Sequence, residues 1–248
     1  IGLESYGEVA CCDNRREDIL SMWGGFIGNP FRIADYGGLS RFGRFNRCIL
    51  PRWVCSSYSD FTIESDTEVY RGYRSVFQRR VRYPSGESFT FDIVGRPHGD
   101  SSVFVFPFCR RSRSATLIKE YNPGGNGVLY GVIAGFVEMG KHTSIVDAAR
   151  RELAEEANLI GGQLIPLQRQ TDSSSAGYLK DKYSTDRFHM FLALDSELDP
   201  SPPQQDPEEF IEIVRGVSLD QVRTLVFNGQ MNVPCSLACL LALEHLRT

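Results

Sequence analysis

The stretch RELAEE (Arg151–Glu156) places three glutamates on a segment with helical periodicity. Residues three and four apart are neighbours on an α-helix, so Glu152, Glu155 and Glu156 should share one edge. Like charges at that separation repel each other, and a hard divalent cation such as magnesium or manganese offsets them best. The alternative is a solvated acidic helix face, on which Arg150 and Arg151 are partial neutralisers.

The residues before this helix predict a strand, a tight loop and a helix N-terminus. Gly135 and Gly140 flank a short apolar segment. Thr143 or Ser144 can cap the N-terminus of the helix, and Asn158 can adopt the left-handed conformation that ends it. A loop and helix of this kind can hold a metal ion beneath a phosphate chain.

Together these segments resemble the sequence box of the Nudix hydrolases, G-x5-E-x7-R-E-U-x-E-E-x-G-U, in which U is aliphatic. The range Arg151–Glu156 matches the helical part of the box, whereas Asn158 replaces its last glycine. The loop before the helix is two residues longer than in the box. Lys141, His142 or Thr143 stands in place of the loop glutamate, so we expect metal binding to be weakened more than abolished.

The resemblance implies a metal-dependent hydrolase that uses magnesium or manganese. Arg151 would orient the carboxylates without being a metal ligand itself, and Glu155 would be a metal ligand or a local base. Gly135 and Glu138 of the loop are expected to contact the substrate. The expected metal ligands are Glu152, Glu155, Glu156 and the backbone carbonyl of Ala134.

Features outside the box are similar to the ADP-ribose and ADP-sugar diphosphatase branch of that family. The branch opens with a small antiparallel sheet that helps to form a dimer, and residues 66–98 have this pattern. Ala134-Gly135 matches a further branch motif but lacks its glutamate. The resemblance covers residues 66–246. It implies a homodimer that cleaves the pyrophosphate of ADP-ribose or of an ADP- or UDP-sugar into two phosphomonoesters.

Asp186, or with less support Asp181, is expected to orient or deprotonate the attacking water in place of the branch's glutamate. The loop before Asp186 is longer than in the branch. The alternative is that Asp186 pairs with Arg187 or with a neighbouring surface cation. Candidates for a wall that stacks on the base and contacts phosphate are Arg71, Tyr73 and Phe77.

From about residue 66 the chain alternates strand patterns with a few helices, which predicts an α+β fold. The expected form is a Nudix-type α/β/α sandwich of mixed sheet with flanking helices, formed by residues 66–248. Residues 102–108 are apolar on both faces. Strands are expected at 69–83, 88–94, 102–108, 115–121, 128–134, 163–170, 188–194 and 210–217, and helices before residue 158 and at 218–227 and 234–246.

Residues 1–65 predict an irregular N-terminal extension. In Phe31–Trp53 arginines alternate with aromatic residues, a pattern that can bind single-stranded nucleic acid or pack on the main domain. We favour packing. With the basic patches at 78–82 and 110–113, this stretch motivates an alternative substrate, the 5′-triphosphorylated end of RNA. The modified loops also leave open a Nudix scaffold without catalysis, which would bind partners through the extension.

The composition of the chain limits its class. Its 248 residues suffice for one large domain or a domain with an extension. A net charge of −4 and a pI near 5.7 exclude a global basic field that recruits nucleic acid. Without a run of about twenty apolar residues, a membrane span is not expected. Seven cysteines without metal-binding spacing fit reduced thiols in an intracellular compartment, cytoplasmic or organellar. A cleaved targeting segment before Ile1 would not be visible.

Overall fold

The computed structural model describes residues 60–96, 99, 101–138, 140–168, 177–203 and 210–247. The chain divides into two units, Ile1–Val54 and Cys55–Thr248, and the described residues belong to the second. The predictions for residues 1–59, including Phe31–Trp53, therefore lie outside the described residues. Residues 62–65, expected to be irregular, belong to a strand that begins at Thr62.

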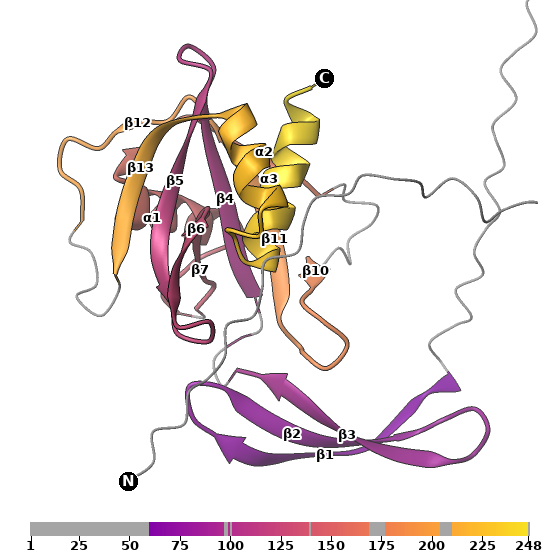
Figure 1. Cartoon of the computed structure of the whole chain (residues 1–248). Helices are drawn as coiled ribbons and strands as arrows, with labels where there is room; N and C mark the ends of the chain where they lie inside the picture. Colours follow the sequence, from indigo (N-terminus) through magenta and orange to yellow (C-terminus); the bar gives the residue numbers. More distant parts are fainter. Residues whose placement is uncertain are drawn as a thin grey trace, which may run out of the picture. The chain divides into compact units, whose positions relative to one another are not determined.

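The main sheet has eight strands: β4 (Ser101–Cys109), β5 (Ser114–Asn122), β6 (Gly127–Gly131), β7 (Ile133–Phe136), β9 (Gln163–Pro166), β10 (Tyr178–Leu179), β11 (Arg187–Leu194) and β13 (Ile211–Ser218). Five of them follow the order β10-β11-β4-β5-β13, which Figure 1 shows side by side. β4 is parallel to β11 and antiparallel to β5 and β7, so the sheet is mixed. The β4–β11 register aligns Val103 with His189 and Phe106 with Leu192.

The apolar side chains on both faces of β4 explain the layers. Phe104 and Phe106 lie in a core shared with α2 (Leu219–Phe227) and α3 (Val233–His245). Val103 and Val105 face the other way and pack with Leu153 of α1 (Ile145–Ala157). Helices thus cover both faces of the sheet (Figure 1), and the predicted α/β/α sandwich is confirmed.

The predicted strands are less accurate where successive residues pair with different neighbouring strands. The single strand expected at 128–134 is two strands, because β6 pairs with β5 and β7 pairs with β4. Val132 lies between them and is fully buried. The pair β8 (Leu159–Ile160) and β12 (Glu197–Leu198) was not expected, since two residues are too few to show a period.

A separate three-stranded antiparallel sheet consists of β1 (Thr62–Arg71), β2 (Ser75–Arg82) and β3 (Ser88–Gly95). The segment expected as a strand at 69–83 contains the end of β1, a turn and the whole of β2. β1 begins earlier, at Thr62, because its many exposed polar residues hide the strand period. Backbone hydrogen bonds join this sheet to the loop before β11. The N–H of Val94 donates to the carbonyl of Tyr183 at 2.8 Å, and the N–H of Thr185 donates to the carbonyl of Val94 at 3.0 Å.

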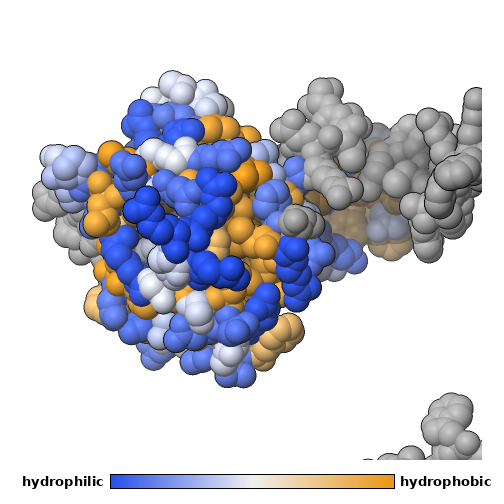
Figure 2. Space-filling view, turned by 90° about the horizontal axis from the view of Figure 1, so that it is seen from above, coloured by the Kyte–Doolittle hydropathy of each residue, from blue (hydrophilic) through white to orange (hydrophobic). Residues whose placement is uncertain are grey.

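On the face shown in Figure 2, hydrophilic and hydrophobic residues are interspersed, as is usual for a protein surface in water. No helix within the described ranges combines the length and the apolar character that crossing a membrane requires.

Both predicted caps of α1 are formed. The Ser144 Oγ accepts a hydrogen bond from the Asp147 N–H at 3.0 Å. Asn158 has φ 52° and ψ 41°, the left-handed conformation, and its N–H donates to the Ala154 carbonyl at 3.1 Å. Ser144 and Asn158 therefore fix where the helix with the three glutamates begins and ends.

Asn158 gives a test of this helix end. Asn158→Ala should lower the free energy of unfolding by about 1 kcal/mol, because a Cβ without a polar side chain disfavours the left-handed conformation. Asn158→Gly should leave it equal or higher. Urea denaturation followed by circular dichroism measures both variants. A loss of stability in the glycine variant equal to that in the alanine variant would contradict this explanation.

Candidate active site

Glu152 and Glu156 lie one turn apart on α1 and bring their carboxylates to the backbone of β7. The Glu156 Oε2 accepts a hydrogen bond from the Ala134 N–H at 2.9 Å. The carboxyl group of Glu152 lies directly over Gly135, where an added Cβ would overlap with it. The two residues are only 9% and 7% exposed. Close approach of a carboxylate to the strand therefore requires glycine at position 135.

These carboxylates line a cavity of about 830 Å³. Glu155, the third glutamate of the helix edge, also lines it and is partly buried. The cavity brings together most of the residues that the sequence nominated, including two from distant segments. Those in its wall are Tyr73, Ala134, Gly135, Glu138, Glu152, Glu155, Glu156 and Asp186.

Arg71 and Arg151 lie away from this wall. Arg71 is largely exposed, and its guanidinium pairs with Glu68 at 2.6 Å. The Arg151 Nε lies 3.4 Å from the Asp147 carboxylate, one turn earlier on the same helix. Neither arginine is among the described residues that line the cavity. The roles predicted for these two residues stay predictions.

The donor chemistry of the carboxylate wall fits a hard divalent cation. Glu152, Glu155 and Glu156 supply oxygen ligands, the type that magnesium and manganese prefer. Within the described part of the chain, no group of three or more carboxylate, imidazole or thiolate side chains forms a ready-made metal site. Magnesium commonly takes only one or two protein carboxylates and completes its shell with water and substrate phosphate. The helical glutamates suit binding of that kind.

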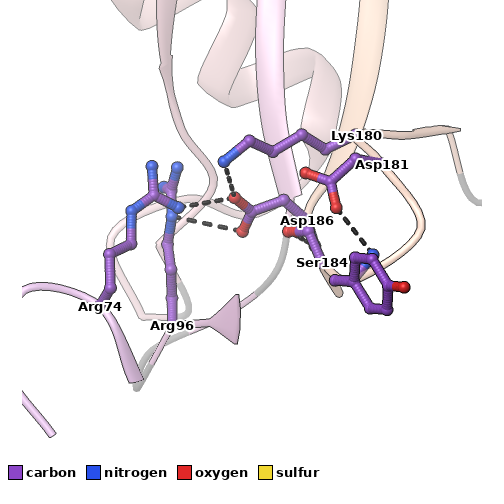
Figure 3. Close-up of polar contacts among 7 residues, drawn as sticks. Arg74, Arg96, Lys180, Asp181, Ser184 and Asp186 are labelled. Carbon is purple, nitrogen blue, oxygen red and sulfur yellow. Dashed lines mark hydrogen bonds and ion pairs between the residues drawn. The ribbon is translucent and has the colours of Figure 1, made fainter. Parts of the chain in front are cut away.

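Asp186 is 1% exposed, and three cations surround its carboxylate (Figure 3). The Arg74 Nη1 donates to its Oδ2 at 2.6 Å. The Lys180 Nζ lies 3.6 Å from the same oxygen, and the Arg96 Nε lies 3.5 Å from Oδ1. The structure thus favours the alternative in which Asp186 pairs with neighbouring cations, although Arg187 is not one of the three. Its role toward the attacking water remains a prediction.

Several residues in the cavity wall were not nominated from the sequence. Arg74 is the neighbour of Tyr73, which was a candidate from the sequence. The sequence therefore indicated this turn, but not that the Arg74 guanidinium lines the cavity. Lys141 stands in the box loop, where the family's glutamate is missing. The additional wall residues with charged or aromatic side chains are Arg74, Arg96, Phe104, Glu120, Phe136, Lys141, Lys180 and Phe188.

The basic patches that suggested RNA are partly neutralised. In the small sheet, Glu64 pairs with Arg80 at 2.9 Å and also with Arg82. Asp66 pairs with Arg79 at 2.6 Å. A hydrogen bond from Ser88, followed by those from Arg82 and Arg80, lowers the pKa of Glu64, so the carboxylate stays charged. The Arg110 Nε lies 2.6 Å from Asp195 in the second patch.

The two cysteines of α3 are core residues. Cys235 and Cys239 are buried, and burial raises the pKa of the Cys235 thiol to about 12. Burial raises the pKa of Cys239 as well. Both thiols are therefore protonated at neutral pH and unsuited to nucleophilic catalysis.

Substitution of Gly135 tests whether the Glu152 carboxylate packs directly on β7. Gly135→Ala should displace the Glu152 carboxylate and lower the affinity for Mn²⁺ by about tenfold or more. In the control Gly131→Ala, the added Cβ meets its nearest atoms at 3.5 Å, so affinity and fold should be unchanged. Titration of Mn²⁺ by electron paramagnetic resonance measures both, with circular dichroism to check folding. Equal Mn²⁺ affinity in the two variants would rule the packing argument out.

Comparison with known proteins agrees with this geometry. A solved structure described as an ADP compounds hydrolase is similar, with a TM-score of 0.61 and 23% sequence identity, over 76% of this chain and 95% of that one. At that identity the likeness concerns the fold alone. No curated protein matches the chain. The family model of the NUDIX domain matches residues 99–233, which include the cavity's carboxylate wall. This chain therefore belongs to the Nudix family.

Proposed function

We propose that the chain is a metal-dependent hydrolase that cleaves the pyrophosphate of a nucleoside diphosphate linked to a second moiety. ADP-ribose and ADP- or UDP-sugars are the expected substrate types. The observation that carries the proposal is the pair of buried carboxylates, Glu152 and Glu156, held against Ala134 and Gly135 in a cavity of about 830 Å³. A cavity of this size suits a nucleotide-sized ligand. The similar fold of an ADP compounds hydrolase supports the choice of substrate class.

The helical glutamates and the Ala134 carbonyl would hold magnesium or manganese. A bound ion of this kind neutralises phosphate charge and lowers the pKa of a coordinated water. Glu155 lines the cavity and is less buried than its two neighbours, so it is the carboxylate best placed to accept a proton from the attacking water. A bond from the water oxygen to phosphorus forms as the bond to the bridging oxygen breaks. The products are two phosphomonoesters.

Lys141 adds a positive charge to the cavity wall. It occupies the region of the missing loop glutamate and lines the cavity, and its Nζ lies 3.9 Å from the Glu138 carboxylate. An ammonium at this place supplies positive charge to a phosphate without a metal ion. This supports catalysis despite the altered loop, against the scaffold alternative. The ion pairs of Arg79, Arg80 and Arg82 with β1 likewise support a small substrate over an RNA end.

The helical glutamates test the proposed function. Glu156→Gln and Glu155→Gln should each lower kcat/KM by at least about 100-fold, since each removes a proposed metal ligand or base. Hydrolysis is screened with magnesium on nucleoside diphosphate sugars, dinucleoside polyphosphates, and capped or triphosphorylated RNA. The control is Glu244→Gln, an exposed residue of α3 that pairs with Arg247. Unchanged turnover in both helical variants would remove the carboxylate mechanism, and no turnover of any substrate would favour the scaffold.

We further propose that the chain forms a homodimer through the small sheet. A three-stranded sheet covers little apolar surface, and Ile63, Val69 and Phe89 of β1 and β3 are 56%, 52% and 44% exposed. An exposed apolar sheet surface of this kind suits association with another copy.

Ile63→Glu should shift the dimer toward monomer, because a buried unpaired carboxylate opposes association. Light scattering after size exclusion gives the mass. Phe227→Glu changes an exposed apolar residue of α2, outside the small sheet, and should leave the mass unchanged. A monomeric parent chain would overturn the proposal of a dimer.

A further inference from the structure

The Asp186 cluster, defined here as Asp186 with Arg74, Arg96 and Lys180, is held together by ion pairs (Figure 3), and all four residues line the cavity. Its members come from segments far apart in sequence. Arg74 lies in the turn between β1 and β2, Arg96 follows β3, and Lys180 and Asp186 flank the loop between β10 and β11. Three cations for one carboxylate leave a surplus of positive charge facing the cavity.

The positive charge of three cations is more than one buried carboxylate needs for its stabilisation. A buried carboxylate is stabilised by one well-placed guanidinium, and the 2.6 Å contact with Arg74 already supplies it. The side chains of Arg74 and Lys180 are 34% and 37% exposed. A guanidinium carries five N–H donors and an ammonium three, so both can donate to a further anion while they keep Asp186.

Aromatic packing fixes the most buried cation. The Arg96 guanidinium carbon lies 3.1 Å from the centre of the Phe136 ring. The ring of Tyr73 contacts Phe136 edge-on, with centroids 6.4 Å apart. Packing of the guanidinium on an aromatic ring restricts rotation of the side chain. The cluster is thus held in place before any ligand arrives, which lowers the entropic cost of binding.

The cluster lies beside the carboxylate wall but is distinct from it. The Glu152 carboxylate lies over Gly135, and the Arg96 guanidinium lies over the next residue of the strand, Phe136. The Asp186 cluster and the helical glutamates both line the cavity of about 830 Å³, so one ligand can contact both. A phosphoryl group bound by metal at the glutamates would leave the next anionic group of the same molecule within reach of the cluster.

We propose that Arg74, Arg96 and Lys180 form a subsite for a second anionic group of the substrate, separate from the phosphate bound at the carboxylate wall. The subsite selects nucleoside diphosphate compounds whose second moiety carries a further phosphate or carboxylate over those with a neutral sugar. Asp186 is the positioning residue that holds the three cations together. This substrate preference rests on the proposed function, whereas the anion site itself does not.

The site is tested with inorganic phosphate as the probe, on the full chain in metal-free buffer at low salt. Isothermal titration should show weak binding, with a dissociation constant in the range of about 1 mM, the level expected of a few charge-assisted contacts. Lys180→Gln and Arg96→Gln should each weaken binding about fivefold or more. Lys180 is partly exposed, so its variant keeps the test valid if Arg96→Gln does not fold.

Two controls make the result specific. Arg79→Gln removes the same charge from the small sheet at an ion pair with Asp66, away from the cavity wall, and should bind phosphate like the parent. Glu156→Gln changes the carboxylate wall, and phosphate binding should not fall. A second measurement compares UDP-glucuronate with UDP-glucose as competitors of bound phosphate; the glucuronate should compete more strongly in the parent and lose this advantage in Lys180→Gln.

The outcomes separate this proposal from the proposed function. Phosphate that binds the parent and both cluster variants equally, or does not bind at all, overturns the subsite and leaves the cluster as a structural tie between the small sheet and the loop before β11. Equal competition by the two sugars overturns the substrate preference. Phosphate binding with the expected losses, but without hydrolysis in the substrate screen, would overturn the proposed function and leave the anion site standing.

Discussion

The constraint on which the structure depends is the burial of two carboxylates against a strand. Glu152 and Glu156 can approach β7 only because position 135 has no Cβ and because the Ala134 N–H satisfies one carboxylate oxygen. Burial of like charges is costly, so their neighbourhood must be rigid and polar at the same time. Leu153, beside Glu152 on the buried side of α1, contributes rigidity by packing into the core formed with β4.

Local signals were sufficient to predict the frame around this constraint. Ser144 and Asn158 act on backbone groups within four residues of themselves, so their roles as caps can be inferred from the sequence alone. The apolar faces of residues 102–108 predict a strand with a core on each side, and the layers follow. The split between β6 and β7 at Val132 has no local signal, because it depends on which neighbouring strand each segment meets.

The Asp186 cluster depends on long-range geometry, which explains why sequence patterns did not predict it. Asp186 and Arg74 are 112 residues apart, and the turn after β1 decides which of its arginines faces the cavity. Arg71 has the same charge but turns to Glu68 on its own strand. The arginines of β2 look like a basic patch in the sequence, yet pairing with β1 places Glu64 and Asp66 opposite them.

The carboxylate wall and the Asp186 cluster therefore have opposite charge. Together they can bind a ligand that neither would bind as well alone. A carboxylate wall repels phosphate unless a cation lies between them, while the Asp186 cluster attracts phosphate directly. A ligand with several anionic groups would thus be attracted to the cluster, whereas its phosphate could approach Glu152 and Glu156 only with a cation held between them. Because Glu152 packs on Gly135 and Arg96 packs on Phe136, a shift of β7 would move the proposed metal ligands and the proposed anion subsite together.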